Sequence, residues 1–149
     1  MTYEIQEISF DIYSNAVYPT QEQFTALLES DFTGPVCMVN LLKFKAQAEY
    51  EDGRSTDLTG IDAYRLYGEQ MRVFVESKGG EFLYFGSCAH LMIGSIDVLW
   101  DQVAIVKYPS KEEFVAIATA PEVAGFGIHR AAGLKGQLLI ASRQDLGMG

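Results

Sequence analysis

The stretch VCMVNLLKF, residues 36–44, decides the fold of this chain. Alternate residues of an extended strand point to opposite sides, so this segment has two faces that are both mostly apolar. A strand of that kind is typical of the centre of a sheet. A helical stretch over residues 61–78 and a second strand over 82–92 follow it. The order recurs in the second half, with a strand over 99–108, a helix that begins at Ser110 and a last strand near 138–141.

Two strand–helix–strand units predict the α+β class, as a ferredoxin-like βαββαβ sandwich with an antiparallel four-stranded sheet. The expected domain spans residues 35–142, preceded by an N-terminal arm and short helix (1–34) and followed by a loose tail (143–149). The helices can cover only one face of the sheet, although both faces are apolar. We therefore expect a homodimer in which two sheets pack face to face. The competing explanation is that the N-terminal arm covers the second face.

Capping signals mark the expected helix ends. A Ser or Thr followed three residues later by Gln or Glu predicts a helix start, and three such pairs occur. They are Thr20 with Gln23, Ser110 with Glu113, and Thr119 with Glu122. Thr59 predicts the start of the long helix and Gly79-Gly80 its end, while the final helix should end at Gly133. The polar segment 46–60 is long for a connection, which favours a lid or binding loop.

Composition excludes several classes of protein. The 149 residues fit one domain, and 20 acidic against 11 basic residues give a net charge of −9. That charge argues against nucleic acid and against an anionic membrane surface as partners. The sequence has no apolar run long enough to span a bilayer, and no basic segment begins an N-terminal signal. Cys37 and Cys88 lie in apolar runs, and we expect two buried free thiols in a reducing cytoplasm.

Several short motifs follow one another along the chain. They are residues 39–44 (VNLLKF), 63–64 (AY), 79–80 (GG), 100–101 (WD), 108–110 (YPS) and 129–134 (HRAAGL). Together they resemble the longer members of a bacterial family, the domain-of-unknown-function 1330 family. The resemblance covers roughly residues 35–142 and implies the ferredoxin-like fold and a homodimer that forms a dimeric α+β barrel. It implies no activity, although the wider superfamily includes cofactor-free monooxygenases, lactone isomerases and haem-dependent enzymes. Residues 125–127 (GFG) depart from the polar helical stretch usual in that family before His129.

The pair His129-Arg130 is the strongest candidate for chemistry. Arg130 is suited to holding a carboxylate or enolate, and a histidine can move a proton near neutral pH. The structural alternative is that Arg130 pairs with a carboxylate such as Asp101 or Glu122. The sequence has no phosphate-binding glycine loop, no zinc-type cysteine pairing and no paired histidines at helical spacing, so we expect neither a metal nor a cofactor.

Other polar or aromatic groups on apolar elements complete the candidate site. His90, with His129, is a candidate for proton transfer. The candidate ligand-binding residues are Asn40, Tyr64, Tyr67, Trp100, Asp101 and Arg130. Two hypotheses stay open: a homodimer that binds a small molecule without catalysis, and a cofactor-free enzyme, monooxygenase-like or isomerase-like, acting on a small aromatic or enolisable acid. They are distinguished by whether Asn40, His90 and Arg130 converge on one cavity.

Overall fold

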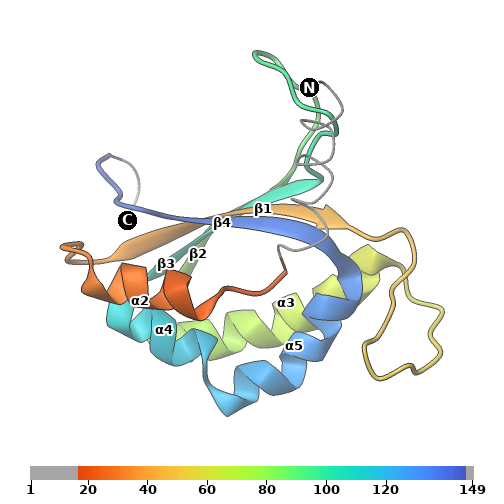
Figure 1. The fold of residues 1–149 in the computed structure, drawn as a ribbon, viewed down its shortest axis with the longest axis horizontal. Coiled ribbons are helices and arrows are strands. Elements are labelled where there is room, and N and C mark those ends of the chain that lie inside the picture. Colours follow the sequence, from red (N-terminus) through yellow and green to blue (C-terminus); the bar gives the residue numbers. More distant parts are fainter. Residues whose placement is uncertain (1–16, 147–149) are drawn as a thin grey trace.

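The computed structural model describes residues 17–146 and confirms the predicted α+β fold (Figure 1). A four-stranded sheet has the order β2-β3-β1-β4, and every neighbouring pair is antiparallel. Most of the predicted N-terminal arm (1–16) and the end of the predicted tail (147–149) lie outside the described residues. The strands are β1 (Val36–Phe44), β2 (Glu81–Ser87), β3 (Gln102–Tyr108) and β4 (Leu134–Ser142). The helices are α2 (Gln21–Glu29), α3 (Gly60–Ser77), α4 (Lys111–Ala118) and α5 (Pro121–Gly133).

The four helices of the described residues, α2 to α5, lie on the same side of the sheet (Figure 1). Alternate residues of the central strand β1 face them, and Val36, Met38 and Leu42 are buried there. Val36 and Met38 form the main core together with Met71 and Val75 of α3. The period of two along β1 therefore sends one set of side chains into a core that the protomer builds from its own helices.

Most of the predicted helix starts are confirmed. Thr20 and Gln23 form a reciprocal capping box, while Thr59 and Ser110 accept N–H groups at the starts of α3 and α4. The predicted cap at Thr119 is wrong. Its hydroxyl instead donates to the carbonyl of Val115 at 2.7 Å and ends α4. Helix α5 begins one residue later with a proline at its first turn, where no N–H is needed, and it runs without a break through residues 125–127.

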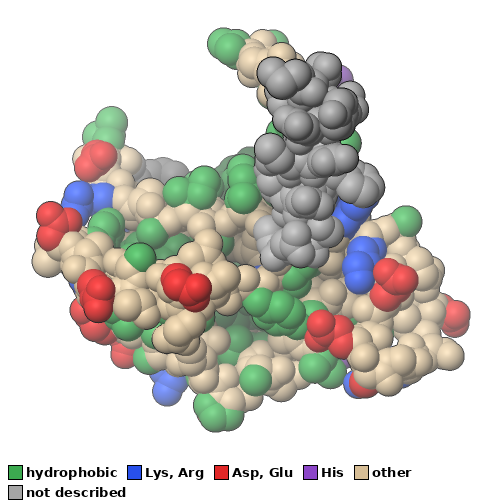
Figure 2. Space-filling view, in the orientation of Figure 1, with side chains coloured by type: hydrophobic (Ala, Val, Ile, Leu, Met, Phe, Trp, Pro, Cys, Tyr) green, Lys and Arg blue, Asp and Glu red, His purple; other side chains and the backbone are tan. Residues whose placement is uncertain are grey.

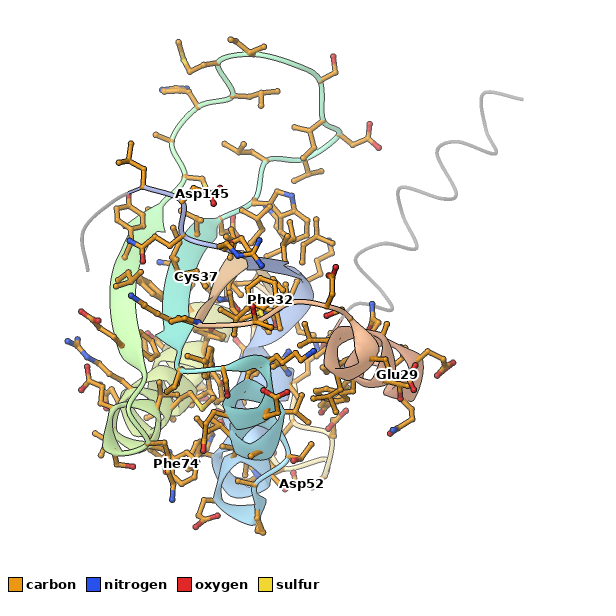
Figure 3. The ribbon with its side chains drawn as sticks, turned by 90° about the vertical axis from the view of Figure 1, so that its left-hand side faces the viewer. Glu29, Phe32, Cys37, Asp52, Phe74 and Asp145 are labelled. Atoms are coloured by element: carbon orange, nitrogen blue, oxygen red, sulfur yellow. The ribbon has the colours of Figure 1, made fainter. Side chains whose placement is uncertain are left out.

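Three predicted strands have wrong boundaries, because pairing partners decide where a strand begins and ends. The predicted strand 99–108 begins only at Gln102, where its pairing with β1 and β2 begins. The predicted strand 82–92 ends at Ser87, opposite Gln102 where β3 begins. Residues 88–101 therefore have no neighbouring strand to continue the ladder and form a projecting connection, which we call the arm. In Figure 3 the arm extends beyond the sheet, away from the helices. The last strand is longer than predicted and begins at Leu134, immediately after α5, because β1 offers it partners as far as Phe44.

The second face of the sheet, which we call the open face, has no helix over it among the described residues. Strand register places a continuous set of apolar side chains there. They are Val39 and Leu41 of β1, Tyr84 of β2, Val103 and Ile105 of β3, and Leu138 and Ile140 of β4. Figure 2 shows hydrophobic side chains along this side of the molecule and at the tip of the arm. The exposed fractions of Tyr84 and Ile140 are 54% and 49%.

Candidate functional site

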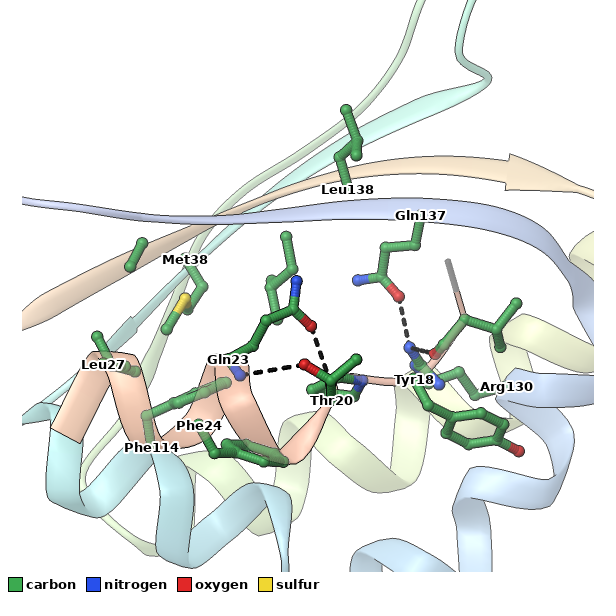
Figure 4. A pocket seen from close by; sticks show the side chains of 14 residues that line it. Tyr18, Thr20, Gln23, Phe24, Leu27, Met38, Phe114, Arg130, Gln137 and Leu138 are labelled. Atoms are coloured by element: carbon green, nitrogen blue, oxygen red, sulfur yellow. Dashed lines mark hydrogen bonds between the residues drawn. The ribbon is translucent and has the colours of Figure 1, made fainter. Parts of the chain in front are cut away.

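A pocket of about 360 Å³ lies between the start of α2 and strand β4 (Figure 4). The segment before α2 closes one end, and helices α4 and α5 contribute to its walls. Its lining residues are Val17, Tyr18, Pro19, Thr20, Gln23, Phe24, Leu27, Met38, Phe114, Arg130, Gln137, Leu138, Leu139 and Ala141. Most of these side chains are apolar. The pocket has the composition of a small-molecule site, in which a few polar groups stand among hydrophobic walls.

Asn40 is the buried amide of β1, and the structure satisfies it completely. Its Nδ2 donates to the carbonyls of Met38 at 3.2 Å and Ala104 at 3.3 Å. Its Oδ1 accepts a hydrogen bond of 2.7 Å from Nε2 of Gln137. Because two carbonyls face Nδ2, the amide orientation is determined by the backbone. Asn40 does not line the pocket, so its predicted role in ligand contact becomes one of orienting Gln137.

Gln137 connects this buried amide to Arg130. Its Oε1 accepts a 2.6 Å hydrogen bond from Nη2 of Arg130, which also donates to the carbonyl of Val17. Asn40, Gln137 and Arg130 thus form one hydrogen-bonded chain that ends at the pocket wall. Figure 4 shows its last link, from Arg130 to Gln137. The predicted site lacked Gln137, because the last strand was expected to begin after it. In the strand register Gln137 lies opposite Leu42, on the same helix-covered face as Asn40, and an earlier start of the last strand would have placed it there.

Arg130 has no carboxylate partner within residues 17–146. The alternative pairing with Asp101 or Glu122 is wrong. Asp101 instead binds Lys43 at 3.1 Å and accepts the backbone N–H of Phe44 at 2.9 Å, whereas Glu122 is exposed in the first turn of α5. Arg130 lies in the last turn of α5, where the helix dipole favours a cation.

Two glycines bring α5 close to α3 and so determine where Arg130 lies. A Cβ atom on Gly133 would collide with the backbone carbonyl of Gly60, and one on Gly60 would collide with that of Lys45. The helices can approach this closely only because both positions lack a side chain. The close approach positions the last turn of α5 beside the segment that precedes α2.

Tyr18 covers Arg130 from the solvent side. The guanidinium carbon of Arg130 lies 5.7 Å from the centre of the Tyr18 ring, and the Tyr18 hydroxyl donates to Glu51 at 2.9 Å. Burial raises the pKa of Tyr18, and the hydrogen bond to Glu51 raises it further. The phenol is therefore neutral at physiological pH, and it contributes an aromatic face but no negative charge to balance Arg130.

Tyr64 and Tyr67 belong to the core behind the pocket and do not line it. Tyr64 packs against Phe44 at 5.3 Å and against Tyr67 at 5.4 Å between ring centres. Burial raises the pKa of both phenols, and the charge of Arg130 opposes that shift in each. The two tyrosines thus lie near Arg130, but in the protein interior and not in the pocket lining.

His90 lies near the first residue of the arm and Trp100 near its last. Trp100 is buried at its base, where Asp101 donates its backbone N–H to Leu42 and accepts one from Cys88. His90 was expected on a strand, yet it lies in the arm and is exposed. Neither Trp100 nor His90 lines the pocket, so Asn40, His90 and Arg130 do not converge on one cavity.

His129 also points away from the pocket. Its Nδ1 lies 2.6 Å from the hydroxyl of Tyr50, a buried residue of the loop between β1 and α3. Burial lowers the pKa of His129, and the charge of Arg54 lowers it further. A hydrogen bond joins the Tyr50 hydroxyl and the imidazole, with the donor set by the ring tautomer. His129 therefore fastens this loop to α5.

The expected lid over the site is a packed loop. Lys45 and Glu49 donate backbone N–H groups to Gly133 and Ala132 at 2.9 and 3.0 Å, which binds the loop to the end of α5. Ala48 is buried in a small cluster with residues of α3 and α5. Only Glu51 reaches the pocket region, through the hydroxyl of Tyr18. The loop supports one wall and does not close over the opening.

The described residues offer no sign of a metal centre or a membrane span. Within 17–146, no group of three or more His, Cys, Asp or Glu side chains is arranged to hold a metal ion. In the same part of the chain, none of the helices combines the length and the apolar character needed to cross a bilayer. Cys37 is a buried free thiol, as predicted, and Cys88 is free but only half-buried.

The chain is similar in sequence and structure to an uncharacterised protein of known structure. No family model and no curated protein matches the chain, so the resemblance to the domain-of-unknown-function 1330 family stays a prediction. A crystal structure of the methylated RPA0582 protein is 34% identical, with a TM-score of 0.79 over 87% of this chain and 95% of that one. A crystal structure of RPA0582 from Rhodopseudomonas palustris, a protein of unknown function, is 32% identical, with a TM-score of 0.76 over 85% and 95%.

Proposed function

Because the chain belongs to the same family as the RPA0582 protein, whose function is unknown, we propose a function from the site itself. The protein is a cytoplasmic homodimer that binds a small organic molecule in the pocket beside Arg130. The observation that carries this proposal is the position of Arg130. Its guanidinium is half-buried at the wall of an apolar pocket, and no carboxylate pairs with it within residues 17–146. A cation held there without an acidic partner favours a ligand in the pocket.

The open face supports the homodimer. Soluble monomers rarely expose contiguous apolar patches larger than a few hundred Å². A second copy offers the same seven-residue surface, so two open faces related by a two-fold axis are self-complementary. Each sheet would then bury its exposed leucine, isoleucine and tyrosine side chains against their equivalents in the other copy.

The arm also favours a second copy as the occupant of the open face. It rises on the same side of the sheet as that face (Figures 1 and 3). Its tip carries Met92 and Ile93, whose exposed fractions are 84% and 91%. Apolar residues on a projecting segment gain burial when a partner sits on the adjoining face. In the proposed dimer, each arm packs along the side of the partner's sheet.

The enzymatic alternative has less support. A cofactor-free enzyme acting on an enolisable acid needs an acid or base within reach of the bound ligand. His129 is hydrogen-bonded to Tyr50 and points away from the pocket, and His90 is exposed in the arm. No histidine lines the pocket within residues 17–146, so binding without catalysis is the better supported function.

Native mass spectrometry combined with light scattering tests the dimer. The variant Ile140→Glu places a carboxylate on the open face at the edge strand β4, where burying it against the partner's apolar side chains would be costly. We expect this variant to be monomeric under conditions in which the unmodified chain is a dimer. Val73→Glu is the matched control, since Val73 is 70% exposed on α3, on the helix side of the molecule. A monomeric unmodified chain, or a dimer unaffected by Ile140→Glu, would contradict the proposed interface.

The same spectra test for a ligand. A pocket occupant that survives purification would appear as reproducible extra mass on the native protein and would disappear on denaturation. The variant Leu139→Trp fills the pocket from β4 and should remove that mass without changing the oligomeric state. A mass that persists in Leu139→Trp would place the occupant elsewhere.

A further inference from the structure

We infer that the pocket ligand is a monocarboxylic acid with an apolar body, its carboxylate on Arg130 and its body between α2 and β4. This inference rests on the proposed function and adds the chemical class of the ligand. It follows from four features of the described residues: an unbalanced charge, unused donors, an oriented hydrogen-bonded chain and apolar walls.

The first feature is the charge of Arg130. The neighbouring groups on the pocket side are neutral: the phenol of Tyr18, the amide of Gln137 and the carbonyl of Val17. Among the described residues that line the pocket, Arg130 is the only charged one. Burial of a cation without an anion is costly, and an anionic ligand removes that cost. Because one positive charge is available, a monoanion balances it, whereas a phosphate dianion would leave negative charge uncompensated in an acidic protein.

The second feature is the set of donors that Arg130 leaves unused. A guanidinium has five N–H groups and no acceptor. Nη2 serves both the carbonyl of Val17 and Oε1 of Gln137. Nε and Nη1 have no acceptor within residues 17–146. Hydrogen bonds from a guanidinium to a carboxylate are stronger than those to a neutral oxygen, so a carboxylate is the acceptor that suits these groups.

The third feature is the way the chain from Asn40 holds Arg130 in place. The carbonyls of Met38 and Ala104 determine the orientation of Asn40, so that its Oδ1 faces Gln137. Gln137 must then donate through Nε2 and accept from Arg130 through Oε1. This directional chain orients the guanidinium before any ligand arrives, which reduces the entropy lost on binding. Asn40 and Gln137 are positioning residues for Arg130.

The fourth feature is the apolar remainder of the pocket. Beyond Arg130 the walls are formed mainly by Phe24, Leu27, Met38, Phe114 and Leu139. The two polar side chains near them, Thr20 and Gln23, use their oxygens on each other's backbone N–H groups. A sugar or nucleotide would therefore leave many polar groups unpaired, while an alkyl or aryl body fits. The volume of about 360 Å³ suits a short ligand, since pockets for small molecules begin near roughly 300 Å³.

Calorimetric titration with octanoate and its neutral analogue octanamide tests this inference. We expect octanoate to bind the native dimer about tenfold or more tightly than octanamide, because a hydrogen-bonded charge discriminates by at least that factor. Arg130→Gln should weaken octanoate binding by a similar factor and abolish the preference for the acid. Arg65→Gln is the matched control, since Arg65 lies on α3 outside this pocket. Equal melting temperatures would confirm that both variants are folded.

The possible outcomes separate this inference from the proposed function. If octanoate and octanamide bind equally well and Leu139→Trp abolishes both, the pocket stands as a binding site and the carboxylate class is overturned. Unchanged octanoate affinity in Arg130→Gln would also overturn the carboxylate class. If the native protein binds neither probe and carries no occupant in native mass spectra, both the inference and the ligand-binding function are overturned.

Discussion

The two faces of the sheet are built by the same strands but lie in different surroundings. On the helix-covered face, Val36 and Leu42 are fully buried, and the one amide of β1, Asn40, has every partner it needs. On the open face, the neighbouring residues Val39 and Leu41 are equally apolar but only half-buried. The difference shows that hydrophobicity alone does not identify the core of a single protomer. A protomer buries the residues its own helices can reach, and the remainder are available to a partner.

Leu41 and Leu42 provide the sharpest test of this contrast, and the largest expected effect. They are adjacent leucines on opposite faces of β1. We expect Leu42→Ala to lower the free energy of unfolding by about 2–5 kcal/mol, since it leaves a cavity in a fully buried site. Leu41→Ala should cost less within one protomer and should act mainly on dimer dissociation. Denaturant unfolding at several protein concentrations separates these two contributions. Equal, concentration-independent losses would break the distinction between the faces.

Asn40 tests whether the covered face depends on its buried polar chain. Replacement by alanine leaves Nε2 of Gln137 without its acceptor, and we expect a loss of about 1–3 kcal/mol in unfolding free energy. The double variant Asn40→Leu with Gln137→Leu should lose less than the sum of the single variants, because both ends of the bond are removed together. Additive losses in the same denaturant assay would show that the bond contributes nothing.

The smallest expected effect concerns the two histidines, one on each side of the sheet. Burial and the charge of Arg54 lower the pKa of His129, so the unfolded chain takes up its proton more readily than the folded one. The stabilisation is complete above the unfolded pKa of about 6.5 and is lost as the pH falls below that value. Melting temperatures between pH 7.5 and 5 should show this loss in the unmodified chain. His129→Gln should reduce the dependence on pH, whereas His90→Gln, in the exposed arm, should retain it.

Local signals predicted most of the fold. The central strand 36–44, the caps at Thr20, Thr59 and Ser110, and the sheet class all follow from nearest-neighbour chemistry. The errors lie where a distant partner decides the outcome. Apolar residues continue past Ser87, but a strand needs a neighbouring strand for its hydrogen bonds. The pairing with β3 stops at Ser87 and Gln102, so β2 ends there. Thr119 matches a capping pattern, yet Pro121 provides a start for α5 that needs no side-chain cap.

The candidate site was predicted in part for a similar reason. Arg130 and Asn40 were identifiable as polar groups within apolar segments. Their connection through Gln137 was not identifiable, because it depends on the register between β1 and β4. Strand β4 begins four residues before the strand that the pattern indicated. The roles expected of His90 and His129 depended on where a loop and a helix face point, and sequence spacing carries no information on that.

By itself, the sequence determined the class of the fold, the alternation of apolar faces along β1 and the presence of a cation on the last helix. Each of these depends on residue type and spacing within one segment. Only the tertiary structure decided which apolar face is covered, that Arg130 meets Gln137 and no carboxylate among the described residues, and that His129 bonds to Tyr50. These outcomes depend on contacts between segments far apart in the chain, where packing and register select one partner among several that local chemistry allows.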